Sequence, residues 1–252
     1  MACKGCGLGP AARHSRLRRN EWRHRGVAVG VTTVGIIGSG NIGGTVAKLA
    51  VVAGHDVVLS NSRGPDTLRD LAAQLGPQAR AGTTDEAAAA GEIVLVSVPL
   101  KAYPALSATS LGGRVVIDTG NYYPARDGAI SELDTKTLTD SEYLARHLPG
   151  AQVVKGFNNI YFKHLLNLAR PVGAADQSFL PIAGDGDGAK TAVTEFLNSI
   201  GYGVVDDGSL GDGWRQQPGT PVYATPYGSF DNELGTPAGE KVIRAALAAA
   251  TR

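Results

Sequence analysis

Cysteine is nearly absent from this chain. Its 252 residues include only Cys3 and Cys6, both close to the N-terminus. The remainder therefore offers no thiol for a disulfide, a metal ligand or a nucleophile, which is typical of a cytoplasmic protein. Cys3 and Cys6 form a C-x-x-C pair, but zinc usually takes a second closely spaced ligand pair, and none follows. We therefore expect no metal site.

Long apolar runs and a strong net charge are also missing. No stretch approaches the ~18 apolar residues that a membrane-spanning helix needs. The formal net charge is +1, but residues 1–31 carry seven Lys or Arg and one acid, so the rest of the chain carries −5. A mildly acidic body is not typical of nucleic-acid binding. We expect neither a membrane nor a nucleic acid as a partner.

Residues 1–31 lack the apolar segment of a secretory signal. They are rich in arginine and poor in residues that could form a core. This composition predicts a disordered basic tail. Organellar targeting or an anionic partner is the alternative interpretation.

Strand-like and helix-like segments alternate from Val31 to about Asp206. The apolar runs at 92–100, 113–121 and 151–159 are typical of strands buried on both faces of a parallel sheet. Eight strand candidates with intervening helices predict an α/β fold with a doubly wound, Rossmann-type parallel sheet over residues 32–206. We expect residues 207–252 to form a small C-terminal segment that completes a substrate site.

The sequence VTTVGIIGSGNIGG (31–44) contains a Gly-x-Gly-x-x-Gly turn between an apolar strand and a helix. In such a turn Gly38 makes the bend, Gly40 lets a pyrophosphate approach the backbone, and Gly43 lets helix and strand pack closely. Free N–H groups at the helix N-terminus then bind the phosphates. The expected cofactor-binding residues of the turn are Gly38, Ser39, Gly40, Asn41, Ile42 and Gly43.

The end of the second predicted strand indicates which dinucleotide binds. NAD-binding folds place an acid about 20 residues beyond the turn, where it binds the ribose hydroxyls. Here Asn61 stands at that distance, followed by Ser62 and Arg63. A hydroxyl and a guanidinium suit a 2′-phosphate. We therefore expect NADP(H), bound through Ser62 and Arg63.

Two further residues are expected beside the cofactor. Val98 and Pro99 follow the predicted strand at 92–100. Ligands of open α/β sheets bind outside the carboxyl ends of the strands. Val98 and Pro99 are therefore predicted to pack near the nicotinamide ribose, although Pro99 could simply end the strand.

Several motifs in this order resemble one family. The glycine turn, SNSR, SVPL, IDTGNYYP, VVKGFNNI, PIAGDGDGAK and QQPGTPVY, spread over residues 32–225, resemble the NADPH-dependent reductases of 8-hydroxy-5-deazaflavin (coenzyme F-420) and their bacterial relatives. The resemblance implies a homodimer that transfers a hydride directly between the nicotinamide C-4 and a deazaflavin. Such chemistry belongs to the cofactors, so no catalytic side chain is expected.

The resemblance also implies residues that contact the small-molecule hydride acceptor. These are Asn158 and Ile160 in VVKGFNNI, and Arg215 and Thr220 in WRQQPGTP. Family members that reduce the deazaflavin often carry His where this chain has Asn158. That departure leaves open a different electron acceptor.

Two alternatives stay open at this point. Lys155 and Asn159 have the K-x-x-x-N spacing that β-hydroxyacid dehydrogenases use on a helix, so Lys155 could act as the acid in reducing a small ketone or imine. On a helix, residues at this spacing lie one turn apart on one face. In this chain the motif spans a strand end instead, which argues against a catalytic Lys155. The second alternative is a non-catalytic module that senses NADPH, because folds of this kind are also used in that way.

Overall fold

One sheet forms the centre of the molecule. A computed structural model describes residues 30–252, so residues 1–29 of the predicted tail, with Cys3 and Cys6, lie outside the described residues. The sheet has eight strands in the order β3-β2-β1-β4-β5-β6-β7-β8. The strands are β1 (Thr33–Ile37), β2 (Asp56–Ser60), β3 (Ala79–Ala81), β4 (Ile93–Val96), β5 (Val115–Asp118), β6 (Gln152–Lys155), β7 (Phe179–Gly184) and β8 (Gly203–Asp206).

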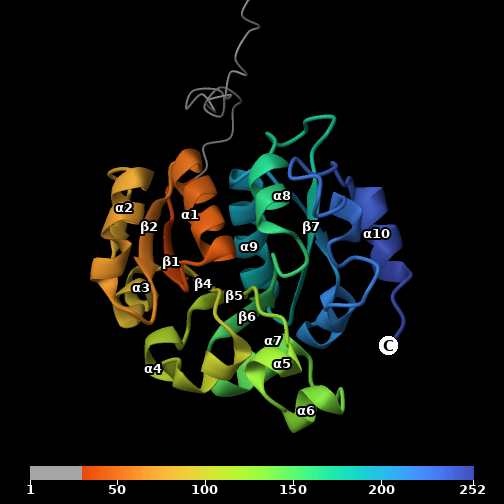
Figure 1. Ribbon diagram of the computed structural model, residues 1–252, viewed down its shortest axis with the longest axis horizontal. Coiled ribbons are helices and arrows are strands. Elements are labelled where there is room, and N and C mark those ends of the chain that lie inside the picture. Colours follow the sequence, from red (N-terminus) through yellow and green to blue (C-terminus); the bar gives the residue numbers. More distant parts are fainter. Residues whose placement is uncertain (1–29) are drawn as a thin grey trace, which may run out of the picture.

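Helices cover both faces of this sheet, as Figure 1 shows for α1, α8 and α9 on the near face. The α-helices are α1 (Asn41–Ala53), α2 (Arg69–Leu75), α3 (Thr84–Ala90), α4 (Ala108–Leu111), α5 (Pro124–Asp127), α6 (Ser131–Asp134), α7 (Asp140–His147), α8 (Phe162–Asn167), α9 (Asp187–Ser199) and α10 (Glu240–Ala248). The 3₁₀ helices are η2 (Pro65–Leu68), η3 (Leu100–Ala105), η4 (Leu210–Gln216) and η5 (Thr225–Tyr227). The predicted α/β fold of Rossmann type is confirmed.

The apolar strands are buried on both faces, as their sequences predict. In β1, Val34 and Ile36 join the core cluster that contains α1, α8 and α9. Ile37 points to the opposite face and joins the cluster that contains α3 and α7. Successive side chains of a strand point to opposite faces, so a strand covered on both sides needs an unbroken apolar run.

The last two strands run opposite to the other six, so the sheet is mostly parallel. β1 to β6 are parallel, but β7 is antiparallel to β6, and β8 is parallel to β7. A parallel crossover requires the chain to return to the opposite edge of the sheet. Between β6 and β7 the chain instead forms only the six-residue helix α8, and β7 starts from the carboxyl edge.

The C-terminal segment packs on the last two strands. Helix α10 contacts β7 and β8, and its residues Ile243 and Leu247 join the same core cluster as β1 and α1. Residues 207–252 therefore share a hydrophobic core with β1 and α1. No helix within residues 30–252 has the length and apolar content that crossing a membrane would require.

Candidate functional site

The glycine turn after β1 has the shape that its sequence predicts. Gly38 has φ +99°, and a Cβ there would lie 2.3 Å from the carbonyl oxygen of Ser97. A Cβ on Gly43 would lie 2.0 Å from the carbonyl oxygen of Gly38, so only glycine lets α1 pack this closely on the turn. Gly40 differs: within residues 30–252, a Cβ added there would have no other heavy atom within 4 Å. The space above Gly40 is thus open to a ligand.

Helix α1 begins directly at this open space. Gly40 is its N-cap residue and makes no side-chain capping bond, and the first turn contains no acidic residue. Asn41 and Ile42, the first helical residues, are exposed and half-buried. The Ser39 hydroxyl donates to the carbonyl oxygen of Ser60, 3.0 Å away, which fixes the turn to β2. A helix N-terminus with uncapped N–H groups is suited to bind phosphate.

Ser62 and Arg63 lie at the carboxyl end of β2, and both are exposed. The backbone N–H of Arg63 donates to Asn61 Oδ1 at 2.8 Å, and Asn61 in turn bonds Thr67 at 2.9 Å. In the part of the chain that the structure describes, the Arg63 guanidinium forms no ion pair. Its backbone is therefore fixed while its charge is available.

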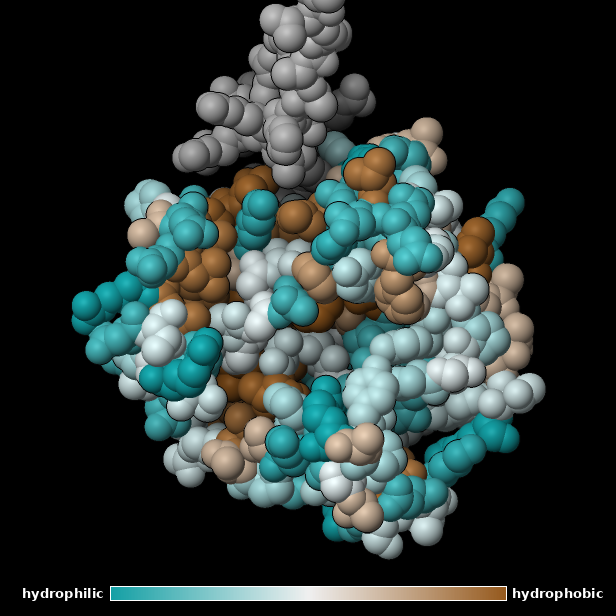
Figure 2. Space-filling model, in the orientation of Figure 1, coloured by the Kyte–Doolittle hydropathy of each residue, from teal (hydrophilic) through white to brown (hydrophobic). Residues whose placement is uncertain are grey.

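Val98 and Pro99 lie next to the glycine turn. A Cβ on Gly38 would be 2.8 Å from Val98 Cγ1, so the two segments are in contact. Val98 is half-buried and Pro99 is exposed, and Pro99 is the N-cap residue of η3. In Figure 2, hydrophobic surface lies between α1 and α4, at the carboxyl ends of the central strands. The structure thus brings together the predicted cofactor-binding residues of three strands.

The predicted acceptor residue Asn158 lies beside this region, in the turn that follows β6. It is 5% exposed. Its Nδ2 donates to Asn121 Oδ1 at 3.0 Å and to the carbonyl oxygen of Gln216 at 2.7 Å. Asn121 Nδ2 donates back to the carbonyl oxygen of Asn158 at 2.8 Å. Asn158 therefore joins three segments: the end of β5, the end of β6 and the end of η4.

Two residues in this region have strained backbones. Phe157 has φ +61° and Ala224 has φ +59°, values that residues with a side chain rarely adopt. The Ala224 N–H donates to the carbonyl oxygen of Asn159 at 2.9 Å. Asn159 Nδ2 donates to the carbonyl oxygen of Val222 at 3.1 Å. Strained residues held by surrounding hydrogen bonds cluster at functional sites.

The other predicted acceptor residues do not all meet Asn158. Ile160 is 5% exposed and belongs to the hydrophobic core. Thr220 donates to the carbonyl oxygen of Gln217 at 2.8 Å and lines a hollow of about 290 Å³ with Tyr122 and Trp214. The contribution of Ile160 and Thr220 to an acceptor site stays a prediction.

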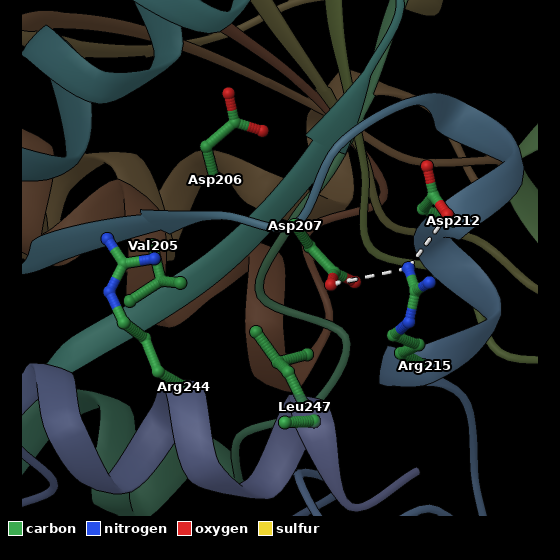
Figure 3. Close-up of a pocket in the computed structure, with 8 residues that line it drawn as sticks. Val205, Asp206, Asp207, Asp212, Arg215, Arg244 and Leu247 are labelled. Atoms are coloured by element: carbon green, nitrogen blue, oxygen red, sulfur yellow. Dashed lines mark hydrogen bonds and ion pairs between the residues drawn. The ribbon is translucent and has the colours of Figure 1, made fainter. Parts of the chain in front are cut away.

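Arg215 lines a different hollow, of about 440 Å³, between η4, β8 and α10 (Figure 3). Its guanidinium lies 2.8 Å from Asp212 and 3.7 Å from Asp207. Burial raises the pKa of Asp207 to about 6, against the opposing effects of Gln216 and Arg215. The structure does not place Arg215 in the hollow of Thr220, and an acceptor could contact it only by competing with these carboxylates.

Lys155 has no exposed surface. Its Nζ donates to the carbonyl oxygen of Gly120 at 3.2 Å and to Ser141 Oγ at 3.4 Å. An ammonium held in this way is poorly placed to deliver a proton to a substrate, which argues against Lys155 as a catalytic acid. Within residues 30–252, no group of three or more His, Cys, Asp or Glu is placed to hold a metal ion.

Some residues of this region were not assigned from the sequence. Asn121 and Gln216 contribute polar groups beside Asn158, and Asp118 and Ser141 lie beneath them. One signal was available: Asp118 is an acid that ends an otherwise apolar strand. Its partners come from distant segments, so the sequence alone does not connect them.

Residues 33–122 match the family of NADP oxidoreductases described as coenzyme F420-dependent. The match extends from β1 through the loop after β5, and it confirms the resemblance predicted from the motifs. It supports NAD(P)-dependent oxidoreduction, with NADP(H) as the cofactor.

Solved structures share the fold over most of the chain. A hypothetical protein from Sinorhizobium meliloti is 29% identical, and the alignment covers 77% of this chain and 93% of that chain with a TM-score of 0.66. An Arthrobacter protein named as a candidate F420-dependent NADP reductase is 24% identical, with coverage of 72% and 86% and a TM-score of 0.59. A Bacillus cereus imine reductase is 20% identical, with coverage of 71% and 56% and a TM-score of 0.52.

Proposed function

We propose that this protein transfers a hydride between NADP(H) and a deazaflavin or flavin-like acceptor. One observation carries the proposal: the space above Gly40 is open directly in front of the uncapped N-terminus of α1. A side chain at Gly40 would fill the place where a pyrophosphate is expected to lie. The match of residues 33–122 to an NADP oxidoreductase family supports the same assignment.

The residues present suit NADP(H). The N–H groups at the start of α1 would bind the pyrophosphate, and Ser62 and Arg63 would bind the 2′-phosphate. Val98 and Pro99 would contact the nicotinamide ribose. When bound, NADPH supplies the hydride for the reaction.

The acceptor half would orient a second ring. Asn158 and Thr220 offer polar contacts, and residues 207–252 complete this half of the site from the side of η4. Hydride transfer needs no acid or base from the protein, which mainly aligns the two rings and excludes water. The ring that accepts the hydride also takes up one proton, which water can supply, so the buried position of Lys155 agrees with this mechanism.

A panel of acceptors tests the proposal. Purified protein and NADPH labelled with deuterium at C-4 would be mixed with 8-hydroxy-5-deazaflavin, with flavin mononucleotide, and with a set of ketones and imines. We expect NADPH oxidation with the deazaflavin or the flavin. With the deazaflavin we also expect deuterium at C-5 of the reduced ring; a reduced flavin exchanges its N-5 hydrogen with water, so NADPH oxidation is the readout there. Oxidation with carbonyl or imine compounds alone would support the ketone or imine reductase, and oxidation with none would support the sensing module.

A further inference from the structure

Three charged side chains are buried beneath the loop that follows β5. Asp118 and Lys155 have no exposed surface, and Asp140 is 3% exposed. Charges are costly to bury and need close partners to remain in a protein interior. The proposed hydride transfer uses none of them directly, so their position calls for another explanation.

Asp118 accepts a hydrogen bond from the loop that follows β5. Its Oδ1 accepts the Tyr103 hydroxyl at 2.6 Å and the backbone N–H of Gly120 at 2.8 Å. Its Oδ2 accepts the Ser141 hydroxyl at 2.6 Å. A carboxylate with three short hydrogen bonds has little freedom to move, so the N–H of Gly120 is fixed in place.

Lys155 and Asp140 form hydrogen bonds with the backbone on either side of Asn121. Lys155 Nζ donates to the carbonyl oxygen of Gly120 at 3.2 Å, and Asp140 Oδ2 accepts the N–H of Tyr122 at 3.0 Å. Burial raises the pKa of Asp140, and the nearby Lys155 opposes that shift. Asn121, between these two bonds, is therefore attached to buried charges through both of its neighbours.

The side chain of Asn121 extends this arrangement to Asn158. The two asparagines exchange hydrogen bonds of 2.8 and 3.0 Å. Asn158 Oδ1 is buried and has no hydrogen-bond partner within residues 30–252. A buried carbonyl oxygen without a partner costs free energy, and an N–H group of a ligand would satisfy it.

We propose that Asn121 is a further specificity-determining residue of the acceptor site, positioned by the buried charges of Asp118, Lys155 and Asp140. The inference rests on the proposed function. Asn158 donates both Nδ2 hydrogens within the protein and keeps Oδ1 as an acceptor, whereas Asn121 Nδ2 uses one hydrogen for Asn158. The pair can therefore offer one donor, from Asn121, and one acceptor, from Asn158, to one edge of a planar ring. They fit an acceptor whose edge carries both carbonyl and N–H groups, as the pyrimidinedione edge of a flavin or deazaflavin does.

Steady-state kinetics with 8-hydroxy-5-deazaflavin and with flavin mononucleotide test this role. Asn121→Ala should raise the KM of the acceptor about tenfold, the effect of losing roughly one hydrogen bond, and leave the Kd of NADPH within about twofold. Asn198→Ala is the matched control, because Asn198 is also half-buried but lies on α9 near the opposite edge of the sheet. Asn121→Ser, measured in parallel, provides a second folded variant.

A double-mutant cycle tests the positioning. Ser141→Ala removes the hydroxyl that lies between Asp118 and Lys155 without adding bulk. It should raise the acceptor KM less than Asn121→Ala does. In the double variant it should add little to the effect of Asn121→Ala, because both substitutions disturb the same contact.

Each outcome has a distinct meaning. An unchanged acceptor KM in folded Asn121→Ala or Asn121→Ser, with an active wild type, would overturn the inference alone. Additive effects of Ser141→Ala and Asn121→Ala would overturn the positioning by buried charges. A wild type that oxidises NADPH with neither ring would overturn the proposed function, and the inference with it.

Discussion

The carboxyl edge of the sheet has two halves that are built differently. Over β1, β2 and β4 the surface is open: Gly40 faces free space, and Arg63 is exposed. Over β5, β6 and η4 it is closed and polar, with buried amides, buried charges and the strained residues Phe157 and Ala224. The first half suits a ligand that brings its own charges, namely the phosphates of NADP(H).

The second half suits a ligand that needs orientation rather than charge neutralisation. Asn158 is tied to Asn121 and Gln216, segments that are distant in sequence. Such a region resists deformation because each hydrogen bond supports the others. Under the proposed function, cofactor binding and acceptor alignment depend on separate parts of this edge, so a substitution should affect one or the other.

The largest expected effect lies at Gly40, in the first half of the edge, over β1, β2 and β4. Gly40→Val places a branched side chain in the open space above the turn, where the pyrophosphate is expected. We expect the affinity for NADPH to fall by about a hundredfold or more, equivalent to ~3 kcal/mol. Titration of NADPH by its fluorescence, with circular dichroism as the check on folding, measures this. Near-normal affinity in a folded variant would refute the role of the turn.

A smaller effect is expected at Arg63, within the same half. Arg63→Ala removes hydrogen bonds to a charged group, each worth roughly 1.5–3 kcal/mol, so NADPH affinity should fall about ten- to a hundredfold. NADH has no 2′-phosphate, and its affinity should barely change. Arg69→Ala is a suitable control, because Arg69 is exposed nearby but paired with Asp66. An unchanged ratio of NADPH to NADH affinity would show that the 2′-phosphate binds elsewhere.

The smallest expected effect is on thermal stability and concerns Asp207, which follows β8 and pairs with Arg215 of η4. Its side chain is 5% exposed, and burial raises its pKa to about 6. An unfolded Asp has a pKa near 3.9, so the folded protein binds this proton more tightly. The contribution of Asp207 to stability therefore falls as the pH rises from about 4 to 6.

Thermal unfolding of Asp207→Asn tests the direction of this pH dependence. The wild type should therefore gain Tm over the variant when the pH is lowered from 7 to 4. In a protein of this size, each kcal/mol of unfolding free energy shifts the Tm by about 2–4 °C. NADPH affinity at neutral pH should be the same in both proteins. A Tm difference that does not depend on pH would contradict the raised pKa.

The shape of the glycine turn could be predicted from sequence because it lies within one short segment. The turn at Gly38–Gly43 occupies six consecutive residues, and a Cβ on Gly38 or Gly43 would clash with neighbouring backbone, a constraint that a short motif encodes. Ser62 and Arg63 follow at a distance set by one helix and one strand. The apolar strands likewise revealed their burial on both faces.

The contacts around Asn158 could not be predicted from sequence in this way. Asn158 meets Asn121 and Gln216 across 37 and 58 residues of chain, and no local pattern encodes those contacts. The reversal of β7 depends on how the chain after β6 packs. Arg215 was predicted to face the acceptor, but its neighbours Asp207 and Asp212, which pair with it, became evident only in the fold.

Under the proposed function, one edge of the sheet holds NADP(H) over β1 and β2 and the acceptor over β5 and β6. Parallel titrations of NADPH and of 8-hydroxy-5-deazaflavin into the wild type, Arg63→Ala and Asn158→Ala test it most directly. The account predicts that Arg63→Ala weakens NADPH binding alone and that Asn158→Ala weakens deazaflavin binding alone, by about tenfold or more. Equal losses of both ligands in each folded variant, or no loss in either, would contradict the claim.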